Sequence, residues 1–110
     1  SPNLKDKYVL QHPKQKNKIL VRSLSDGIGG AWEEYGVALF PLKTAKKIKL
    51  ISDKLKIGWN VIPAIKIGFE CPVIDYNAFG ETEGEYLNSL VRELPLQIEL
   101  EKRLKKNRRK

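Results

Sequence analysis

The sequence has one cysteine, Cys71, and one histidine, His12. A single cysteine excludes a disulfide within the chain and suits a reducing environment, so we expect an intracellular protein of undetermined compartment. A Cys/His zinc site needs about four ligands, which one residue of each kind does not supply. We therefore expect no metal and no other cofactor.

Long hydrophobic runs are also absent. The longest candidates, such as residues 36–42, are short and contain Pro41, whereas a helix needs ~20 apolar residues to cross a bilayer. Residues 1–5 have no apolar stretch after a charged one, so we expect no secretory signal. The sequence predicts no membrane partner.

Positive charge is the strongest feature that the sequence does have. The chain carries 21 Lys and Arg against 13 Asp and Glu, a net charge of +8. Such an excess raises affinity for polyanions and speeds encounters with them. Many basic proteins nevertheless have a solvated basic surface with no specific partner. The charge alone therefore makes nucleic-acid binding a hypothesis and does not identify a ligand.

The charge is distributed in blocks. Residues 1–22 hold six basic groups against Asp6, and residues 43–57 hold six against Asp53. Residues 102–110 carry seven positive charges and no negative ones, whereas residues 70–101 hold eight acidic groups against Arg92. The basic blocks can converge on one face, or they can pair with the acidic block, and the sequence does not choose between these arrangements.

The first half of the chain predicts strands. Residues 18–24 and 35–40 are rich in apolar and β-branched side chains, and a glycine-rich turn at 25–30 separates them. Residues 1–17 are polar and basic, and we expect an arm or an edge strand there. Residues 64–70 alternate between apolar and polar side chains, which predicts a half-buried strand extended by residues 71–76, with a turn at 77–80.

Residues 43–57 fit two patterns. As a helix they place Ala45, Ile48, Ile51 and Leu55 on one stripe, with Thr44 as N-cap and Gly58 as the stop. As a hairpin they alternate around residues 52–53. We favour the helix, because it accounts for more of the boundary signals.

The last thirty residues predict helix. Thr82 and Glu85 have the spacing of a capping box, and Leu87, Leu90, Val91 and Leu94 form the expected buried stripe. Pro95 must kink or end this helix, since it lacks an N–H group. A second helix can begin there, supported by the pairs Glu99/Arg103 and Glu101/Lys105 and frayed from Lys105 onward.

These elements predict an α+β fold, with a small antiparallel or mixed sheet packed against a C-terminal helix. A small β-barrel with a C-terminal helix is the alternative if residues 43–57 form a hairpin. We expect residues 18–101 to form a single domain, after the arm or edge strand of 1–17 and before a polybasic tail at 102–110.

Catalytic signals are weak. Residues 27–30 lack the Lys and Ser/Thr of a nucleotide-binding loop, His12 has no evident partner, and Cys71 stands in an apolar run. We expect no enzyme. A small metal-dependent nuclease remains a minor alternative, because scattered carboxylates can bind magnesium; these are Asp26, Glu33, Glu34, Asp75 and Glu81.

Our main functional hypothesis is a non-enzymatic nucleic-acid-binding accessory protein that contacts phosphates, of RNA or DNA, through lysine and arginine clusters. Trp59 is the better candidate of the two tryptophans for stacking on a base, although both also suit a core. The candidate binding residues are Lys46, Lys47, Lys49, Lys54, Trp59, Lys102, Arg103, Lys105, Lys106, Arg108, Arg109 and Lys110.

A protein-interaction or assembly module is the alternative hypothesis. Leu96, Leu100 and Leu104 recur at every fourth position after Pro95, beyond the expected core. An apolar helix stripe in that position favours a protein partner or a homo-oligomer.

Overall fold

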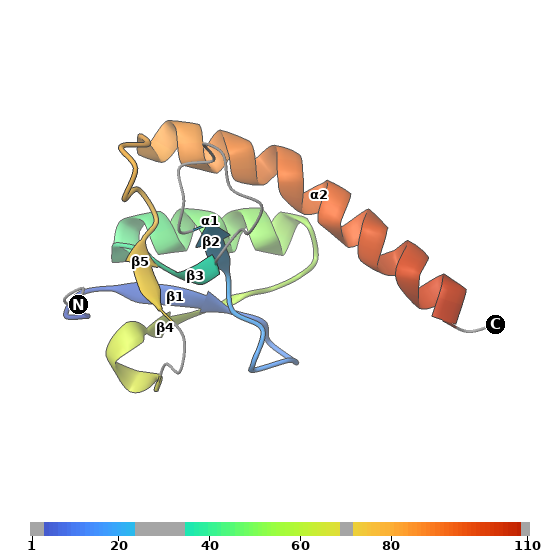
Figure 1. The fold of residues 1–110 in the computed structure, drawn as a ribbon, viewed down its shortest axis with the longest axis horizontal. Coiled ribbons are helices and arrows are strands. Elements are labelled where there is room, and N and C mark those ends of the chain that lie inside the picture. Colours follow the sequence, from blue (N-terminus) through green and yellow to red (C-terminus); the bar gives the residue numbers. More distant parts are fainter. Residues whose placement is uncertain (1–3, 24–34, 69–71, 109–110) are drawn as a thin grey trace.

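The fold is α+β, as the sequence predicts. The structure, a computed structural model, describes residues 4–23, 35–68 and 72–108 (Figure 1). Its elements in chain order are β1 (Tyr8–Gln11), β2 (Val21–Ser23), β3 (Tyr35–Leu39), α1 (Leu42–Lys54), β4 (Asn60–Pro63), the 3₁₀ turn η1 (Ala64–Lys66), β5 (Val73–Asp75) and α2 (Glu83–Arg108).

The strands form two small sheets. β1 pairs antiparallel with β4, so that Val9 lies opposite Ile62. In the second sheet β3 is central, antiparallel to β2 and parallel to β5, which makes it the mixed sheet expected from the sequence. The described strands do not close into a barrel, so the barrel alternative is wrong. It depended on a hairpin at 43–57, and that segment is helical instead.

The core lies between the sheets and the two helices. Val9 and Leu10 of β1 are fully buried, so the segment expected to be an arm or an edge strand contributes a strand to the core. Nearly continuous apolar residues bury β3 on both faces, as expected for its sequence. The rings of Phe40, Tyr76 and Tyr86 pack together at centroid distances of 5.1–5.6 Å, which joins the end of β3, the turn after β5 and α2.

α1 confirms the helical interpretation of residues 43–57, but one boundary signal was wrong. Pro41 occupies the N-cap position, and Thr44 is a buried residue whose hydroxyl donates a 2.7 Å hydrogen bond to Glu83 on α2. The helix therefore uses Thr44 to contact α2 rather than to cap itself. After Leu55 the chain turns through Lys56 and Gly58, both with positive φ.

The predicted strand at 64–70 is wrong where the structure describes it. Asn60–Pro63 forms β4, and the chain then enters η1, which leaves Ile65 72% exposed. The N–H of Ala64 donates to the carbonyl of Lys7, so pairing with β1 ends there. The continuation does form a strand, β5, as proposed for residues 71–76; residues 69–71 lie outside the described part.

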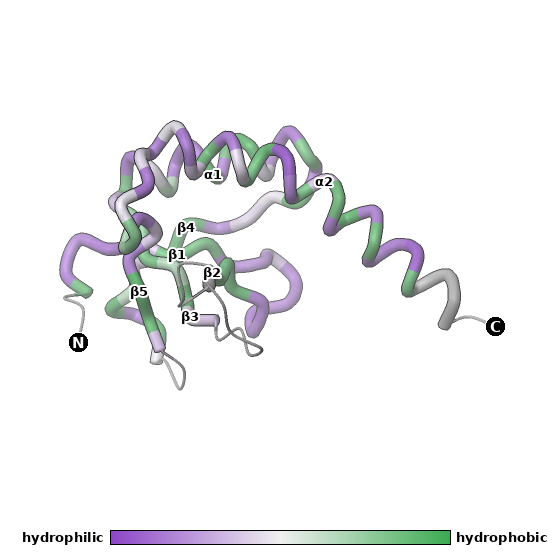
Figure 2. The backbone as a smooth tube through the Cα atoms, turned by 45° about the horizontal axis from the view of Figure 1, so that its top comes forward, coloured by the Kyte–Doolittle hydropathy of each residue, from purple (hydrophilic) through white to green (hydrophobic). Residues whose placement is uncertain are grey.

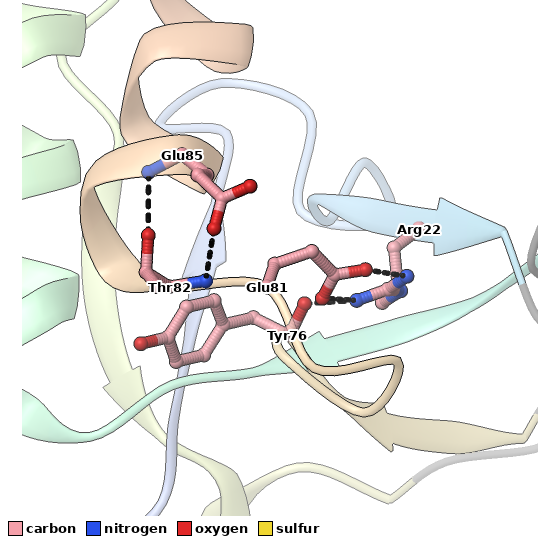
Figure 3. A network of polar contacts seen from close by, with 5 residues as sticks. All are labelled: Arg22, Tyr76, Glu81, Thr82 and Glu85. Atoms are coloured by element: carbon pink, nitrogen blue, oxygen red, sulfur yellow. Dashed lines mark hydrogen bonds and ion pairs between the residues drawn. The ribbon is translucent and has the colours of Figure 1, made fainter.

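α2 begins with the predicted capping box. The Thr82 hydroxyl accepts the Glu85 N–H at 3.1 Å, and the Glu85 carboxylate accepts the Thr82 N–H at 3.2 Å (Figure 3). Leu90 and Leu94 are buried as expected. Val91, assigned to the same stripe, is 50% exposed, because the contact with the domain covers a narrower face than the sequence pattern suggested.

Pro95 kinks α2 without ending it. The helix is continuous from Glu83 to Arg108 with Pro95 at its midpoint, and Figures 1 and 2 both show a change of direction halfway along it. Of the two outcomes that the sequence left open at Pro95, the kink is confirmed and a separate helix starting there is not, since losing one N–H donor bends this helix but leaves its other backbone bonds. The second half extends past the domain (Figure 1).

Neither helix in the described ranges has the length and apolar content that would let it cross a membrane.

Candidate nucleic-acid interface

A groove of about 530 Å³ lies beside the second half of α2. Three segments that are distant in sequence form its walls: the connection between β1 and β2, the turn that follows α1, and the stretch of α2 around Pro95. Its lining residues are His12, Pro13, Lys14, Lys18, Leu55, Lys56, Ile57, Trp59, Leu94, Gln97, Ile98, Glu101 and Lys102.

The groove is basic. Lys14, Lys18, Lys56 and Lys102 line it, against the single carboxylate of Glu101. Lys18 and Glu101 form an ion pair at 2.8 Å. Within the described part of the chain, Lys14, Lys56 and Lys102 have no carboxylate partner, so three positive charges remain uncompensated around one groove.

The turn after α1 fixes the position of Lys56. The Lys56 backbone has φ 63°, a left-handed conformation that a lysine seldom adopts. Its N–H donates to the Asp53 carbonyl at 3.0 Å, and the next N–H, that of Ile57, donates to the Ser52 carbonyl at 2.9 Å. These bonds close the helix end and direct the chain back past the groove.

His12 closes the turn that carries Lys14. Its Nδ1 atom accepts the backbone N–H groups of Lys14 and Gln15, both at 3.1 Å. The His12 N–H in turn donates to the Lys18 carbonyl at 2.9 Å, which closes the loop at its base. His12 therefore has a structural role at the groove, because its imidazole holds the backbone of this loop in place.

Trp59 belongs to the core. It is 8% exposed, and its backbone N–H donates to the buried hydroxyl of Ser52 at 3.1 Å. Its small accessible part lines the groove. This burial leaves too little ring surface for a base to stack on, so the structure favours the core interpretation of Trp59 over the stacking platform.

The lysines of α1 do not act as one cluster. Lys46 and Lys54 are exposed, and no described carboxylate pairs with them. Lys47 forms an ion pair with Glu83, and Lys49 pairs with Asp53 at 3.5 Å while donating to the Trp59 carbonyl at 3.2 Å. Of these four predicted residues, two are therefore committed to contacts within the protein, and none lines the groove.

The predicted basic tail is helical as far as the structure describes it. Lys102 lines the groove, and Arg103 is exposed, 3.7 Å from Glu99 as the predicted pair requires. The backbone of residues 105–108 continues α2. The side chains of Lys105, Lys106 and Arg108, and the whole of Arg109 and Lys110, lie outside the described part of the chain.

The acidic block neutralises much of the remaining basic charge. Asp75 pairs with Lys7 at 3.3 Å, and Glu81 makes two 3.0 Å contacts with Arg22 (Figure 3). Arg22 holds the pKa of the Glu81 carboxyl below its usual value, and Lys47 and Thr44 do the same for Glu83. The two arrangements left open by the sequence therefore coexist: some basic residues pair internally, and others converge on the groove.

These pairs also bear on the nuclease alternative. Of its five carboxylates, Asp75 and Glu81 are engaged in ion pairs, and Asp26, Glu33 and Glu34 lie outside the described residues. Among the described residues, no three His, Cys, Asp or Glu side chains gather as a metal site would require.

A second groove, of about 510 Å³, has the opposite charge. It lies beside the first half of α2, where Glu81, Glu85 and Glu93 line it with Arg22. The two grooves adjoin, because Leu94 and Gln97 line both of them. A polyanion is repelled by the second groove and attracted by the first.

Lys14, Lys18 and Lys56 are the groove residues that sequence reasoning did not select. Each belongs to a basic block recognised in the sequence, but nothing in local spacing relates Lys14 to Lys56 or to Lys102. The left-handed turn at Lys56 and the loop closed by His12 bring them together.

Comparison with protein-family models, with curated proteins and with solved structures gives no match.

Proposed function

We propose that this protein is a non-enzymatic nucleic-acid-binding accessory protein whose phosphate-binding site is the basic groove. The observation that carries the proposal is the convergence of Lys14, Lys56 and Lys102, which have no carboxylate partner in the described chain, from three separate segments. Neutral or cationic ligands gain nothing from three uncompensated lysines, whereas a polyanion such as a phosphate backbone is attracted to them.

The basic end of α2 extends the same charge beyond the groove. Residues 102–110 carry seven positive charges, beginning with Lys102 at the groove itself. A polynucleotide lying in the groove can therefore continue along α2 without leaving positive potential. Lys46 and Lys54, exposed on α1, are available to a long ligand but are secondary in this proposal.

The buried position of Trp59 favours contacts to phosphates over contacts to bases. Lysines bind phosphates as point charges, and phosphate contacts carry no sequence information. We therefore expect binding with little sequence preference and a steep dependence on salt, because each neutralised phosphate releases counterions.

The test is fluorescence anisotropy with labelled single- and double-stranded DNA and RNA over a salt series. We expect Lys14→Gln/Lys56→Gln/Lys102→Gln to weaken binding at least tenfold and to reduce the salt slope on duplex DNA by about 3. A variant lacking residues 105–110 should weaken binding as well, and the four ligands show which nucleic acid is preferred.

The matched control removes the same charge elsewhere. Lys43→Gln/Lys66→Gln/Arg92→Gln changes three exposed basic residues outside the groove and should retain most of the affinity. Lys46→Gln/Lys54→Gln measures the contribution expected from α1. Equal losses in the groove variant and the control would mean that net charge alone drives binding, and absence of binding at low salt would refute the proposal.

A further inference from the structure

The projecting half of α2 carries an apolar stripe that its own domain does not cover. Leu96, Leu100 and Leu104 are 71%, 58% and 49% exposed. Figure 2 shows hydrophobic positions recurring between hydrophilic ones along this part of the helix. Three leucines in one row on a single exposed helix are unusual for a solvated surface, because such a row leaves apolar area in water.

The leucine row and the groove lie on neighbouring faces of α2. With about 3.6 residues per turn, Leu96, Leu100 and Leu104 form one row, and the groove begins directly beside it at Gln97. The other α2 residues that line the groove lie farther around the helix; they are Leu94, Ile98, Glu101 and Lys102. The three leucines do not line the groove, so this inference rests on their exposure and not on the nucleic-acid proposal.

Charge around the stripe distinguishes between the two orientations of a second copy. Residues 90–99 hold Glu93 and Glu99 against Arg92, a net charge of −1, whereas residues 102–110 carry seven positive charges. Two parallel α2 helices would set these basic ends side by side, which is repulsive. Antiparallel helices avoid this repulsion, because they place the basic end of each copy beside the slightly acidic residues 90–99 of the other.

Leucine spacing agrees with the antiparallel arrangement. A twofold axis at Leu100 pairs Leu96 of one copy with Leu104 of the other, so the row is complementary to itself. The same axis brings Glu99 within about two residues, or ~3 Å along the helix, of Arg103 in the second copy. Glu99 and Arg103 already lie on a common side of α2, where they pair at 3.7 Å.

We propose that the second half of α2 is a self-association surface, on which two copies of this chain pair antiparallel about Leu100. Three leucines per copy bury less area than a standard stable interface, so the dimer is weak and concentration-dependent. The two copies present their basic grooves together, which would strengthen binding to a long polyanion through avidity.

The first test is the oligomeric state by sedimentation equilibrium without nucleic acid, up to about 1 mM chain, since a millimolar Kd marks the weak end of association. We expect a monomer–dimer equilibrium that Leu100→Glu weakens at least tenfold. Leu50→Glu, at an equally exposed leucine on α1, is the control and should leave it unchanged. A monomer throughout, or equal effects of both variants, would overturn the proposal.

The orientation is tested by disulfide trapping in a Cys71→Ser background, because two cysteines bridge only when their Cα atoms lie within about 7 Å. Leu100→Cys should cross-link with itself. Leu96→Cys should not, but should cross-link with Leu104→Cys in a mixture. If Leu96→Cys forms a disulfide with itself, and Leu104→Cys does the same when tested alone, the helices pair in parallel, which would contradict the antiparallel arrangement.

Discussion

At the scale of single residues, Arg22 of β2 makes several contacts with the turn between β5 and α2. It donates to the Tyr76 carbonyl and to both carboxylate oxygens of Glu81 (Figure 3), and its guanidinium lies 4.7 Å from the centre of the Phe79 ring. Its side chain is 12% exposed. One cation from β2 thereby contacts three residues of this turn, Tyr76, Phe79 and Glu81.

Glu81→Gln removes the charge that Arg22 faces, and we expect it to lower the free energy of unfolding at pH 7 by about 1–3 kcal/mol. Chemical denaturation measures this loss. Asn77→Ala, an exposed position of the same turn, is a control expected to change little. An unchanged free energy in Glu81→Gln would mean that Arg22 is held by its other contacts.

The same ion pair sets a dependence on pH. Because the pKa of Glu81 is lowered in the folded state from its usual 4.5, its stabilising contribution is complete above that value. The contribution is lost as the pH falls below 4.5 and through the lowered pKa. Glu81→Gln should therefore show a shallower loss of stability in acid than the unaltered protein, although Glu83 retains its own contribution in the same direction. Parallel acid titrations of both proteins decide this.

At the scale of elements, local sequence signals were most reliable where they act through neighbouring residues. The capping box of Thr82 and Glu85 formed as predicted, since both partners lie within one helical turn. The alternating residues 64–70 did not predict the strand correctly, because β1 pairs with Asn60–Pro63 instead. This pairing depends on residues of β1, which are far away in the chain. The sequence correctly predicted that Pro95 distorts the helix, but the backbone hydrogen bonds on either side of it keep α2 continuous.

Thr82→Ala should lower the free energy of unfolding by about 1 kcal/mol, because it leaves the Glu85 N–H without its acceptor. Asn88→Ala, at an exposed position inside the same helix, should cost nothing, since alanine is the better helix former. Urea unfolding followed by circular dichroism compares the two variants. Equal losses would show that the cap contributes nothing beyond helix propensity.

At the scale of the whole molecule, the N-terminal segment belongs to the folded unit. β1 pairs with β4, and Leu10 packs in the cluster that includes Phe40, Ile48 and Trp59. Leu10 is 1% exposed. The sequence predicts only an arm or an edge strand for this segment, because basic and polar residues surround a very short apolar run.

Leu10→Ala should therefore lower the free energy of unfolding by about 2–5 kcal/mol, the range for a buried leucine. Leu50→Ala, at an exposed leucine on α1, is the matched control and should cost far less. Thermal and urea unfolding measure both. Similar small losses in the two variants would argue that β1 is detachable from the domain.

The sequence by itself determined the α+β class, the helix at 43–57, the capping box and the basic balance of the chain, because these depend on local pattern and composition. Only the tertiary structure decided which charges are neutralised and which converge. Lys18 and Glu101 pair across 83 residues, and the groove lysines come from three segments. Coulombic interaction depends on distance in space, so a spacing along the chain cannot predict it once the chain has folded back on itself.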